Sequence, residues 1–240
     1  MRLIPALCCF SLWMTALCIS PAWAQVRIIA FEIPGLHQQD FQGGYDKIIN
    51  QILVAEQLAY LEIFPPARAE KLFSDCQNCC ITPANSDAEF YSYDSEVIVS
   101  DAMNTAKIYI FSPPGSPIIT SLSQLQDKVI GTRYGMPYGN TFVAANLKKI
   151  EVSMLKEHLK LIEYKHIDAF IAYAPDVFHM FEKAGITPFP HYRQKPYAVH
   201  PDALVCRGVS QDFINTFNSG LDKLKKSGDV KKILGDRYLP

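Results

Sequence analysis

The chain has 240 residues, of which 49% are hydrophobic and 20% charged, and its formal net charge is −1 at pH 7. This length suits one large or two modest globular domains. The near-neutral charge, without a long run of either sign, argues against a nucleic-acid partner, and the chain contains no low-complexity segment or internal repeat.

Residues 1–24 predict a cleavable signal peptide. Arg2 gives a charged start, residues 6–19 form an apolar core, and Ala22-Trp23-Ala24 is a small-x-small cleavage site before Gln25. A retained membrane anchor is the alternative, but the apolar core is shorter than the roughly 20 residues that a bilayer span needs. We therefore predict a protein secreted to the bacterial periplasm and processed at Gln25.

Four of the seven cysteines lie beyond that segment: Cys76, Cys79, Cys80 and Cys206. In an oxidising compartment they predict one or two disulfides, and all three full pairings of four cysteines stay open. A zinc site on the first three is the alternative. It is disfavoured because neighbouring cysteines in an extended segment point to opposite faces, and no histidine pair at helical spacing accompanies them. We predict no metal and no cofactor.

The first half of the chain alternates predicted strands and helices. Short apolar or alternating runs indicate strands, apolar residues at helical spacing indicate helices, and Pro66 suits the first turn of a helix. The strands are predicted at 26–31, 60–64, 80–82, 96–100 and 106–112, and the helices begin near residue 45 and at residue 66. Together they predict a first sheet.

The stretch 108–140 predicts a passage from one compact unit to another. Its apolar run ends at Pro113 and Pro114, which have no N–H for a strand ladder, and a capping-box pattern at Ser121 and Gln124 follows. The later elements imply a second parallel-type sheet. They are predicted strands at 128–132, 168–173 and 203–206, and predicted helices at 141–149, 153–164 (capped by Ser153), 174–184 and 213–224.

Several local phrases resemble the extracellular solute-binding proteins of family 3, the bilobed periplasmic receptors of amino-acid-type ABC importers. They are residues 42–49 (QGGYDKII), 122–131, 167–171 (IDAFI) and 221–238, and their order and spacing follow the family over nearly all of residues 25–240. The resemblance implies an α/β, two-lobed periplasmic-binding-protein fold that holds a ligand between its lobes. Lobe 1 would comprise 25–112 and 200–240, lobe 2 would comprise 113–199, and hinge strands would lie near 109–113 and 197–205.

The sequence departs from the family at two ligand positions. Members that bind α-amino acids usually carry an arginine shortly before the first hinge strand, where its guanidinium clamps the carboxylate, and residues 100–107 contain none. A second-lobe aspartate usually holds the amino group, and Tyr173 occupies the matching position. Both departures weaken the interpretation of the ligand as an α-amino acid.

Candidate ligand-binding residues follow from the implied fold, because ligands meet the carboxyl ends of strands and the loops beyond them. Tyrosines offer a flat apolar face and a hydroxyl, which suit a small polar ligand. Arg68 could instead pair on the surface with Glu70 or Asp75, and Glu32 could hold a cation or cap its loop. The candidates are Glu32, Tyr45, Arg68, Tyr91, Arg133, Tyr138 and Tyr173.

We predict a monomeric periplasmic solute-binding protein that captures a small polar ligand between its lobes and delivers it to an inner-membrane ABC permease, without chemistry on the ligand. The sequence has no G-x-S-x-G, H-E-x-x-H or phosphate-loop motif, and the glycines at 131, 135 and 139 are interpreted as turn residues. One alternative is a sensory or accessory protein that docks on a membrane partner. Another is a dehydratase-like enzyme that uses a cleft acid such as Glu32.

Overall fold

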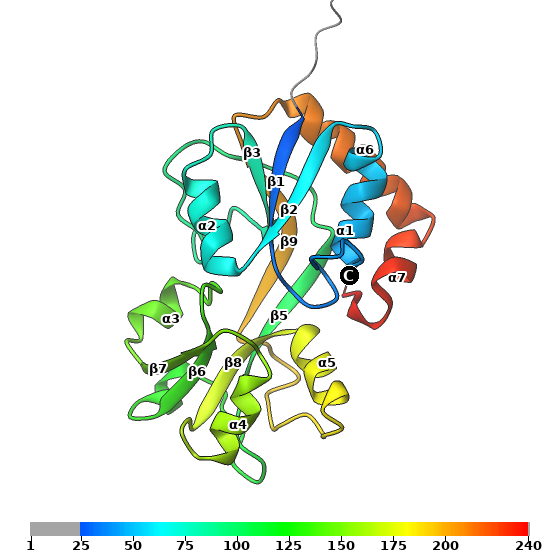
Figure 1. The fold of residues 1–240 in the computed structure, drawn as a ribbon. Helices are drawn as coiled ribbons and strands as arrows, with labels where there is room; N and C mark the ends of the chain where they lie inside the picture. Colours follow the sequence, from blue (N-terminus) through cyan, green and yellow to red (C-terminus); the bar gives the residue numbers. More distant parts are fainter. Residues whose placement is uncertain (1–24, 240) are drawn as a thin grey trace, which may run out of the picture.

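The computed structural model describes residues 25–239, so the predicted signal peptide lies outside the described residues. Two α/β lobes are joined by β5 (Asn104–Phe111) and β9 (Ala198–Arg207), which run side by side from one lobe to the other (Figure 1). Within 25–239, no helix has the length and apolar character to cross a membrane.

Lobe 1 has a sheet in which β1 is parallel to both β2 and β3, while β9 is antiparallel to β3. Its helices cover the sheet, and one continuous apolar core lies between these layers. Pro66 begins a helix, where the missing N–H has no intrahelical partner to lose. The elements are β1 (Val26–Phe31), α1 (Gly44–Ile49), a π-helix (Asn50–Val54), β2 (Ala59–Phe64), α2 (Pro66–Ser74), β3 (Cys79–Ala84), β4 (Ile98–Val99), α6 (Gln211–Lys226), α7 (Asp229–Leu234) and a short 3-10 turn (Gly235–Arg237).

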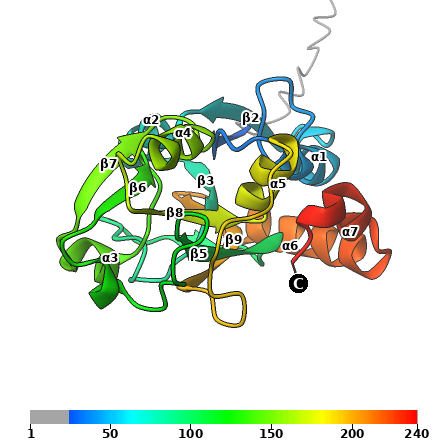
Figure 2. The ribbon, with the colours of Figure 1, turned by 90° about the horizontal axis from the view of Figure 1, so that it is seen from below.

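Lobe 2 has β6 parallel to both β7 and β8, and β8 antiparallel to β5. Two apolar clusters cover the two faces of this sheet, with α3 on one face and α4 and α5 on the other (Figure 2). The elements are a 3-10 turn (Leu122–Leu125), β6 (Val129–Arg133), α3 (Asn140–Ala144), β7 (Lys148–Val152), α4 (Glu157–Glu163), β8 (Ala169–Ala174) and α5 (Asp176–Lys183).

The two joining strands are hydrogen-bonded to each other. Residues 104–108 pair antiparallel with residues 198–202, so the strands form one continuous path in the order β2-β1-β3-β9-β5-β8-β6-β7, where the sequence predicts two separate sheets. Met103, the residue before β5, packs in the core of lobe 1. Ala106, on β5, packs in the core of lobe 2. The paired segment lies just before the predicted first hinge, 109–113, and the predicted lobe limits at 112/113 and 199/200 stay a prediction.

Three local predictions differ from the structure. The helix predicted at 141–149 ends at Ala144, because Asn146 takes a positive φ of 48° and Lys148 begins β7. Ser153 does not cap the following helix, which begins at Glu157; the Ser153 N–H donates to the Glu157 carboxylate at 3.1 Å. Finally, β9 begins at residue 198 rather than at 203, where the residue pattern places it, and this start agrees with the hinge strand that the resemblance implies near 197–205.

The four cysteines form two disulfides. Cys80–Cys206 joins β3 to β9, where the two residues lie opposite each other, and Cys76–Cys79 closes the turn after α2. These pairs occupy the thiols that the zinc alternative would require. No group of three or more histidine, cysteine, aspartate or glutamate residues in the described part of the chain is arranged to hold a metal ion.

Candidate functional site

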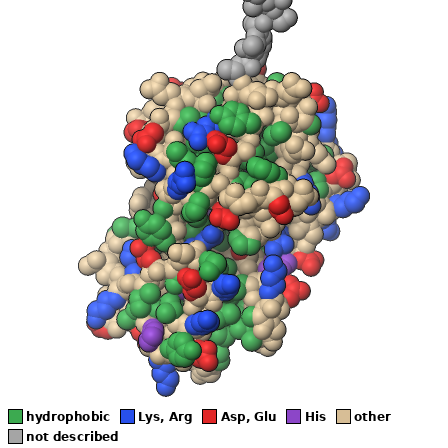
Figure 3. Space-filling model, viewed as in Figure 1, with side chains coloured by type: hydrophobic (Ala, Val, Ile, Leu, Met, Phe, Trp, Pro, Cys, Tyr) green, Lys and Arg blue, Asp and Glu red, His purple; other side chains and the backbone are tan. Residues whose placement is uncertain are grey.

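The lobes contact each other on both sides of the space between them. Arg133, at the end of β6, donates from Nη2 to the Glu32 carbonyl at 2.8 Å. Across the interface, the Thr141 N–H donates to the Glu89 carboxylate at 2.8 Å. Each contact joins lobe 2 to lobe 1, and we call this arrangement of touching lobes the closed form. Figure 3 shows acidic and basic side chains interspersed over the visible face of both lobes.

Two glycines in the loop after β6 allow this close approach. Gly135 has a φ of +74°, and a Cβ added to it would lie 2.4 Å from the backbone nitrogen of Ala67 in lobe 1. Gly139 has a φ of +94°, and its added Cβ would lie 2.5 Å from Glu89 Oε1. Both values of φ favour glycine over any residue with a side chain. The regular glycine spacing in the sequence therefore reflects both turns and contact with the opposite lobe.

A small cavity, which we call the hinge-side cavity, lies between the lobes beside β5 and β9. Its volume is about 20 Å³, which is room for about one water molecule, whereas pockets for drug-sized ligands measure roughly 300–1,000 Å³. The closed lobes therefore hold almost no free space here. The cavity is lined by Phe31, Ile33, Leu36, Pro83, Tyr91, Ala106, Met136, Pro137, Tyr173, Pro175, Asp176, His200 and Asp202.

A chain of hydrogen bonds runs along one wall of this cavity. The Tyr45 hydroxyl donates to Asp202 Oδ2 at 2.5 Å, and Asp202 Oδ1 lies 2.8 Å from His200 Nδ1. His200 Nε2 lies 3.0 Å from the Tyr91 hydroxyl. Because a carboxylate oxygen only accepts, His200 Nδ1–H donates to Asp202 Oδ1. Asp202 and His200 are both buried, so these bonds compensate their removal from water.

The opposite wall, in lobe 2, contributes Asp176 and Tyr173. Burial raises the pKa of Asp176 from 3.8 to about 7, an effect that the nearby Arg237 guanidinium partly opposes. Asp176 Oδ1 has no hydrogen-bond partner among the described residues, and it lies 3.9 Å from Arg237 Nε in lobe 1. Burial also raises the pKa of Tyr173 well above its ordinary value of 10, so its hydroxyl keeps its proton and donates to the Pro137 carbonyl.

Comparison with known proteins identifies the fold. No protein-family model matches the chain, and no curated protein matches it. Solved structures do match over nearly the whole chain. The ligand-binding core of GluR0 in complex with L-glutamate has a TM-score of 0.71 at 14% identity, covering 91% of this chain and 100% of that one. The chain has the fold of the two-lobed periplasmic binding proteins.

Two further structures with this fold belong to a transport receptor and to a sensor domain. The substrate-binding protein of an amino acid ABC transporter matches with a TM-score of 0.68 at 15% identity, covering 90% of this chain and 99% of that one. A histidine kinase sensor domain with similarity to periplasmic binding proteins matches with a TM-score of 0.67 at 12% identity, covering 90% and 98%. At these identities the likeness establishes the fold, and it is consistent with the resemblance to family 3.

The predicted site residues take different places in this binding-protein fold. Tyr91 and Tyr173 line the hinge-side cavity, and Tyr45 is buried behind it against Asp202. Glu32 and Arg133 lie at the contact between the lobes. Their roles as ligand contacts stay a prediction.

The remaining two candidates lie away from the cavity. The Tyr138 hydroxyl is buried in lobe 2, where it accepts from the Arg133 N–H at 2.9 Å. Arg68 is exposed on α2, with its guanidinium carbon 4.9 Å from the centre of the Phe64 ring. Asp75, a proposed surface partner for Arg68, pairs with Lys71 instead at 2.9 Å.

Sequence reasoning missed Asp176, His200 and Asp202 as cavity residues. The residue pattern alone predicts a strand only over 203–206, and the hinge strand near 197–205 comes from the family resemblance. In the structure Pro201 lies within β9, opposite Thr105. A signal was nevertheless present, since His200 and Asp202 are two residues apart and a strand places such residues on one face.

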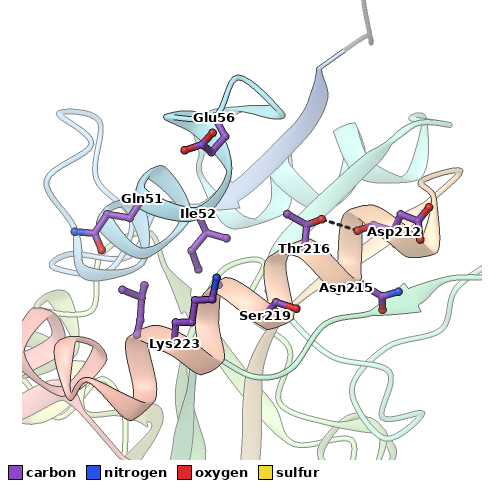
Figure 4. Close-up of a pocket in the computed structure, with 10 residues that line it drawn as sticks. Gln51, Ile52, Glu56, Asp212, Asn215, Thr216, Ser219 and Lys223 are labelled. Atoms are coloured by element: carbon purple, nitrogen blue, oxygen red, sulfur yellow. Dashed lines mark hydrogen bonds between the residues drawn. The ribbon is translucent and has the colours of Figure 1, made fainter.

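A larger hollow lies elsewhere on the binding-protein fold, between the π-helix and α6 of lobe 1. It measures about 720 Å³ and is lined mainly by polar, exposed side chains such as Gln51, Glu56 and Lys223 (Figure 4). Asp212 and Thr216 also face it, and the Thr216 hydroxyl donates to the Asp212 carbonyl at 2.8 Å. Because its charged side chains are solvated, nothing in this groove requires a ligand.

Proposed function

We propose that the chain is a periplasmic solute-binding protein that captures a small polar ligand between its two lobes and releases it to an inner-membrane ABC permease. The observation that carries this proposal is the convergence of the buried His200 and Asp202 and the partly buried Asp176 on one cavity between the lobes, beside the two hinge strands. Closure of two lobes around a ligand is a common form of hinge motion. The protein acts as a monomer, because both lobes of one chain form the site.

Ligand entry requires the lobes to separate. The cavity of about 20 Å³ in the closed form cannot admit a molecule as large as an amino acid. Opening at the paired segment of β5 and β9 breaks the contact between Arg133 and Glu32 and exposes Asp176, His200 and Tyr91. A ligand then re-forms the closed state around itself, with a wider separation than that of the empty protein.

The charges at the cavity favour a ligand with a cationic or hydrogen-bond-donating group. Its lining includes the carboxyl groups of Asp176 and Asp202, and none of the lining residues is an arginine or lysine. Burial raises the pKa of Asp176 to about 7, and an ammonium group beside it favours its ionised form and pairs with it. We propose a small amine as the ligand, which fits the departure of the sequence from the carboxylate-clamping arginine.

The test is a thermal-unfolding screen of residues 25–240 followed by circular dichroism, with amino acids, monoamines, polyamines, organic acids and short sugars. A ligand at about 100 times its dissociation constant adds about 2.7 kcal/mol of stability. Amines are expected to raise the midpoint by several degrees and to be recovered unchanged by mass spectrometry. A screen in which only anions raise the midpoint would contradict the proposed ligand class.

Two aspartate variants sharpen this test. Asp176→Asn removes a carboxylate from the cavity and is expected to weaken amine binding about tenfold. The control is Asp212→Asn, the same chemical change at an exposed position of α6, and it should leave the affinity unchanged. Equal affinities in the two variants would remove Asp176 from the site.

A sensory or accessory protein that docks on a membrane partner is the second candidate. The small volume of the hinge-side cavity favours it, and a histidine kinase sensor domain is among the proteins with this fold. If no compound in the screen changes the midpoint, this second function becomes the better proposal. Conversion of a ligand, detected by mass spectrometry in the same samples, would instead identify an enzyme.

A further inference from the structure

A second hollow lies between the lobes and is distinct from the hinge-side cavity, although both are bordered by Ile33 and Asp176. We call it the outer groove. It measures about 420 Å³, which is within the usual range for small-molecule pockets. It is lined by Ile33, Pro34 and Arg237 from lobe 1 and by Arg133, Met154, Leu155, Lys156, Leu159, Asp176, His179, Met180, Lys183 and Ala184 from lobe 2.

The floor of the outer groove is apolar. Leu155 lies in the turn before α4, Leu159 lies on α4, and Met180 lies on α5. Met154 is 50% exposed, although such a large apolar side chain is usually removed from water. An apolar surface that remains wet in a concave space gains stability when a ligand covers it.

The rim of the groove is basic. Arg133 is held by the carbonyls of Glu32 and Ser153, which fix the guanidinium without neutralising its charge. Lys156 and Lys183 are exposed and form no ion pair with any residue in the described part of the chain. Together with Arg237 they provide four cations around the hollow.

Two other ionisable groups face the outer groove and are already engaged. The carboxylate of Asp176 is the acidic group in the lining, and it lies 3.9 Å from Arg237 Nε. His179 Nδ1 lies 3.1 Å from the Glu182 carboxylate on the same helix. The balance of charge at the rim is therefore positive.

We propose that the outer groove binds an amphipathic organic anion, in which a carboxylate or sulfonate is attached to an aromatic or short alkyl body. The apolar body lies on Met154, Leu159 and Met180, and the anionic group meets the cations of the rim. Guanidinium and ammonium groups both bind such oxyanions through charge-assisted hydrogen bonds. This site goes beyond the proposed function, because its space and its charge preference differ from those of the hinge-side cavity.

Such an anion also stabilises the closed form. Ile33 and Arg237 belong to lobe 1, whereas Lys156 and Lys183 belong to lobe 2. A molecule that touches both groups finds its complete site only when the lobes are together. Its binding therefore shifts the population towards closure by its difference in affinity for the two states.

The test uses two fluorescent probes with the same aromatic body. One is 8-anilinonaphthalene-1-sulfonate, an anion, and the other is N-phenyl-1-naphthylamine, which lacks the sulfonate. Each is titrated into folded residues 25–240 at low ionic strength, and octanoate is then added as a competitor. The sulfonate is expected to bind about tenfold more tightly than the neutral probe, to weaken with added salt and to be displaced by octanoate. Equal binding of the two probes would overturn the proposal.

Charge-reversal variants locate the site. The double variant Lys156→Glu/Lys183→Glu changes two exposed residues at the rim and is expected to weaken sulfonate binding at least about tenfold. The control is Lys148→Glu/Lys149→Glu, an equal change of charge at exposed positions of β7 outside the groove, with an expected loss below about twofold. Similar losses in both double variants would show a general charge effect and overturn the proposal.

A further pair tests the apolar floor. Met154→Asp places a carboxylate under the aromatic body and should abolish binding, whereas Val143→Asp, at a 69% exposed residue of α3, should not. Circular dichroism checks that all variants remain folded. The probe titration measures binding to the outer groove, and the thermal screen with amines measures binding to the hinge-side cavity. Either proposal can therefore fail while the other stands.

Discussion

The pH dependence of stability should reveal Asp176. Burial raises the pKa of its carboxyl from 3.8 to about 7, with Asp202 adding to the rise and Arg237 opposing it. Between these two values the folded protein holds a proton that the unfolded chain has released. Stability contributed by this group is therefore complete below about pH 4 and is lost as the pH rises through about 7.

The size of the effect follows from the shift. A change of one pKa unit corresponds to about 1.4 kcal/mol, so a rise of about three units gives a loss of about 4 kcal/mol between pH 4 and pH 8. Asp176→Asn keeps the shape of the side chain and removes the titration. The variant should match the wild type below about pH 4 and exceed its stability by about 4 kcal/mol at pH 8.

Urea unfolding of both proteins, followed by circular dichroism at pH 5, 6, 7 and 8, measures this difference. The difference in unfolding free energy between variant and wild type should grow with pH and level off above about pH 7. Asp168→Asn is a control, since Asp168 is exposed and accepts from the Val129 N–H at 2.7 Å. A constant difference across the pH range would refute the reasoning, because it would mean that Asp176 is hydrated in the folded protein.

Two further predictions concern closure and the disulfides. Gly135→Ala should destabilise the closed form by about 1–2 kcal/mol, because a residue with a Cβ disfavours the left-handed conformation and the added Cβ meets Ala67. Small-angle X-ray scattering should therefore show a larger radius of gyration for this variant than for the control Gly115→Ala. Gly115 also has a positive φ, but a Cβ added there meets no atom within 4 Å. Replacing Cys80 and Cys206 by alanine should lower the unfolding free energy by about 4 kcal/mol, since that disulfide closes a long loop. Replacing Cys76 and Cys79 by alanine should lower the unfolding free energy much less, because that disulfide closes a loop of only a few residues. Urea unfolding of both variants measures the difference.

The sequence predicted the buried elements of the fold better than the exposed ones. The strand at 26–31 was predicted with the bounds that it has, because its continuous apolar run can only be buried. The strand β7, in contrast, was not predicted, and its first two residues were assigned to the end of the helix at 141–149. Its residues Lys148, Lys149 and Glu151 are exposed at the edge of the sheet, so the pattern carries little apolar signal, and the pairing with β6 decides the structure.

The candidate site was harder to predict for a different reason. Tyr91 and Tyr173 were selected because they follow or end predicted strands. His200 and Asp202 belong to a hinge strand whose course depends on pairing with residues about 95 positions earlier, Asn104 to Ala106. Such long-range pairing has no local signature, since Pro201 by itself argues against a strand. The hydrogen bonds of His200 with Tyr91 and Asp202 come from that pairing.

Closure links the two proposed sites. Asp176 lines both the hinge-side cavity and the outer groove, and its carboxylate approaches Arg237 across the lobe interface. An anion in the outer groove pairs with Arg237 and so weakens the interaction of Arg237 with Asp176. Asp176 is then available to pair with an amine in the hinge-side cavity. Because both ligands require the closed lobes, each raises the affinity for the other by the same factor. We therefore expect a carrier with both proposed sites to hold its amine more tightly when amphipathic anions are present and to release the amine when they are diluted.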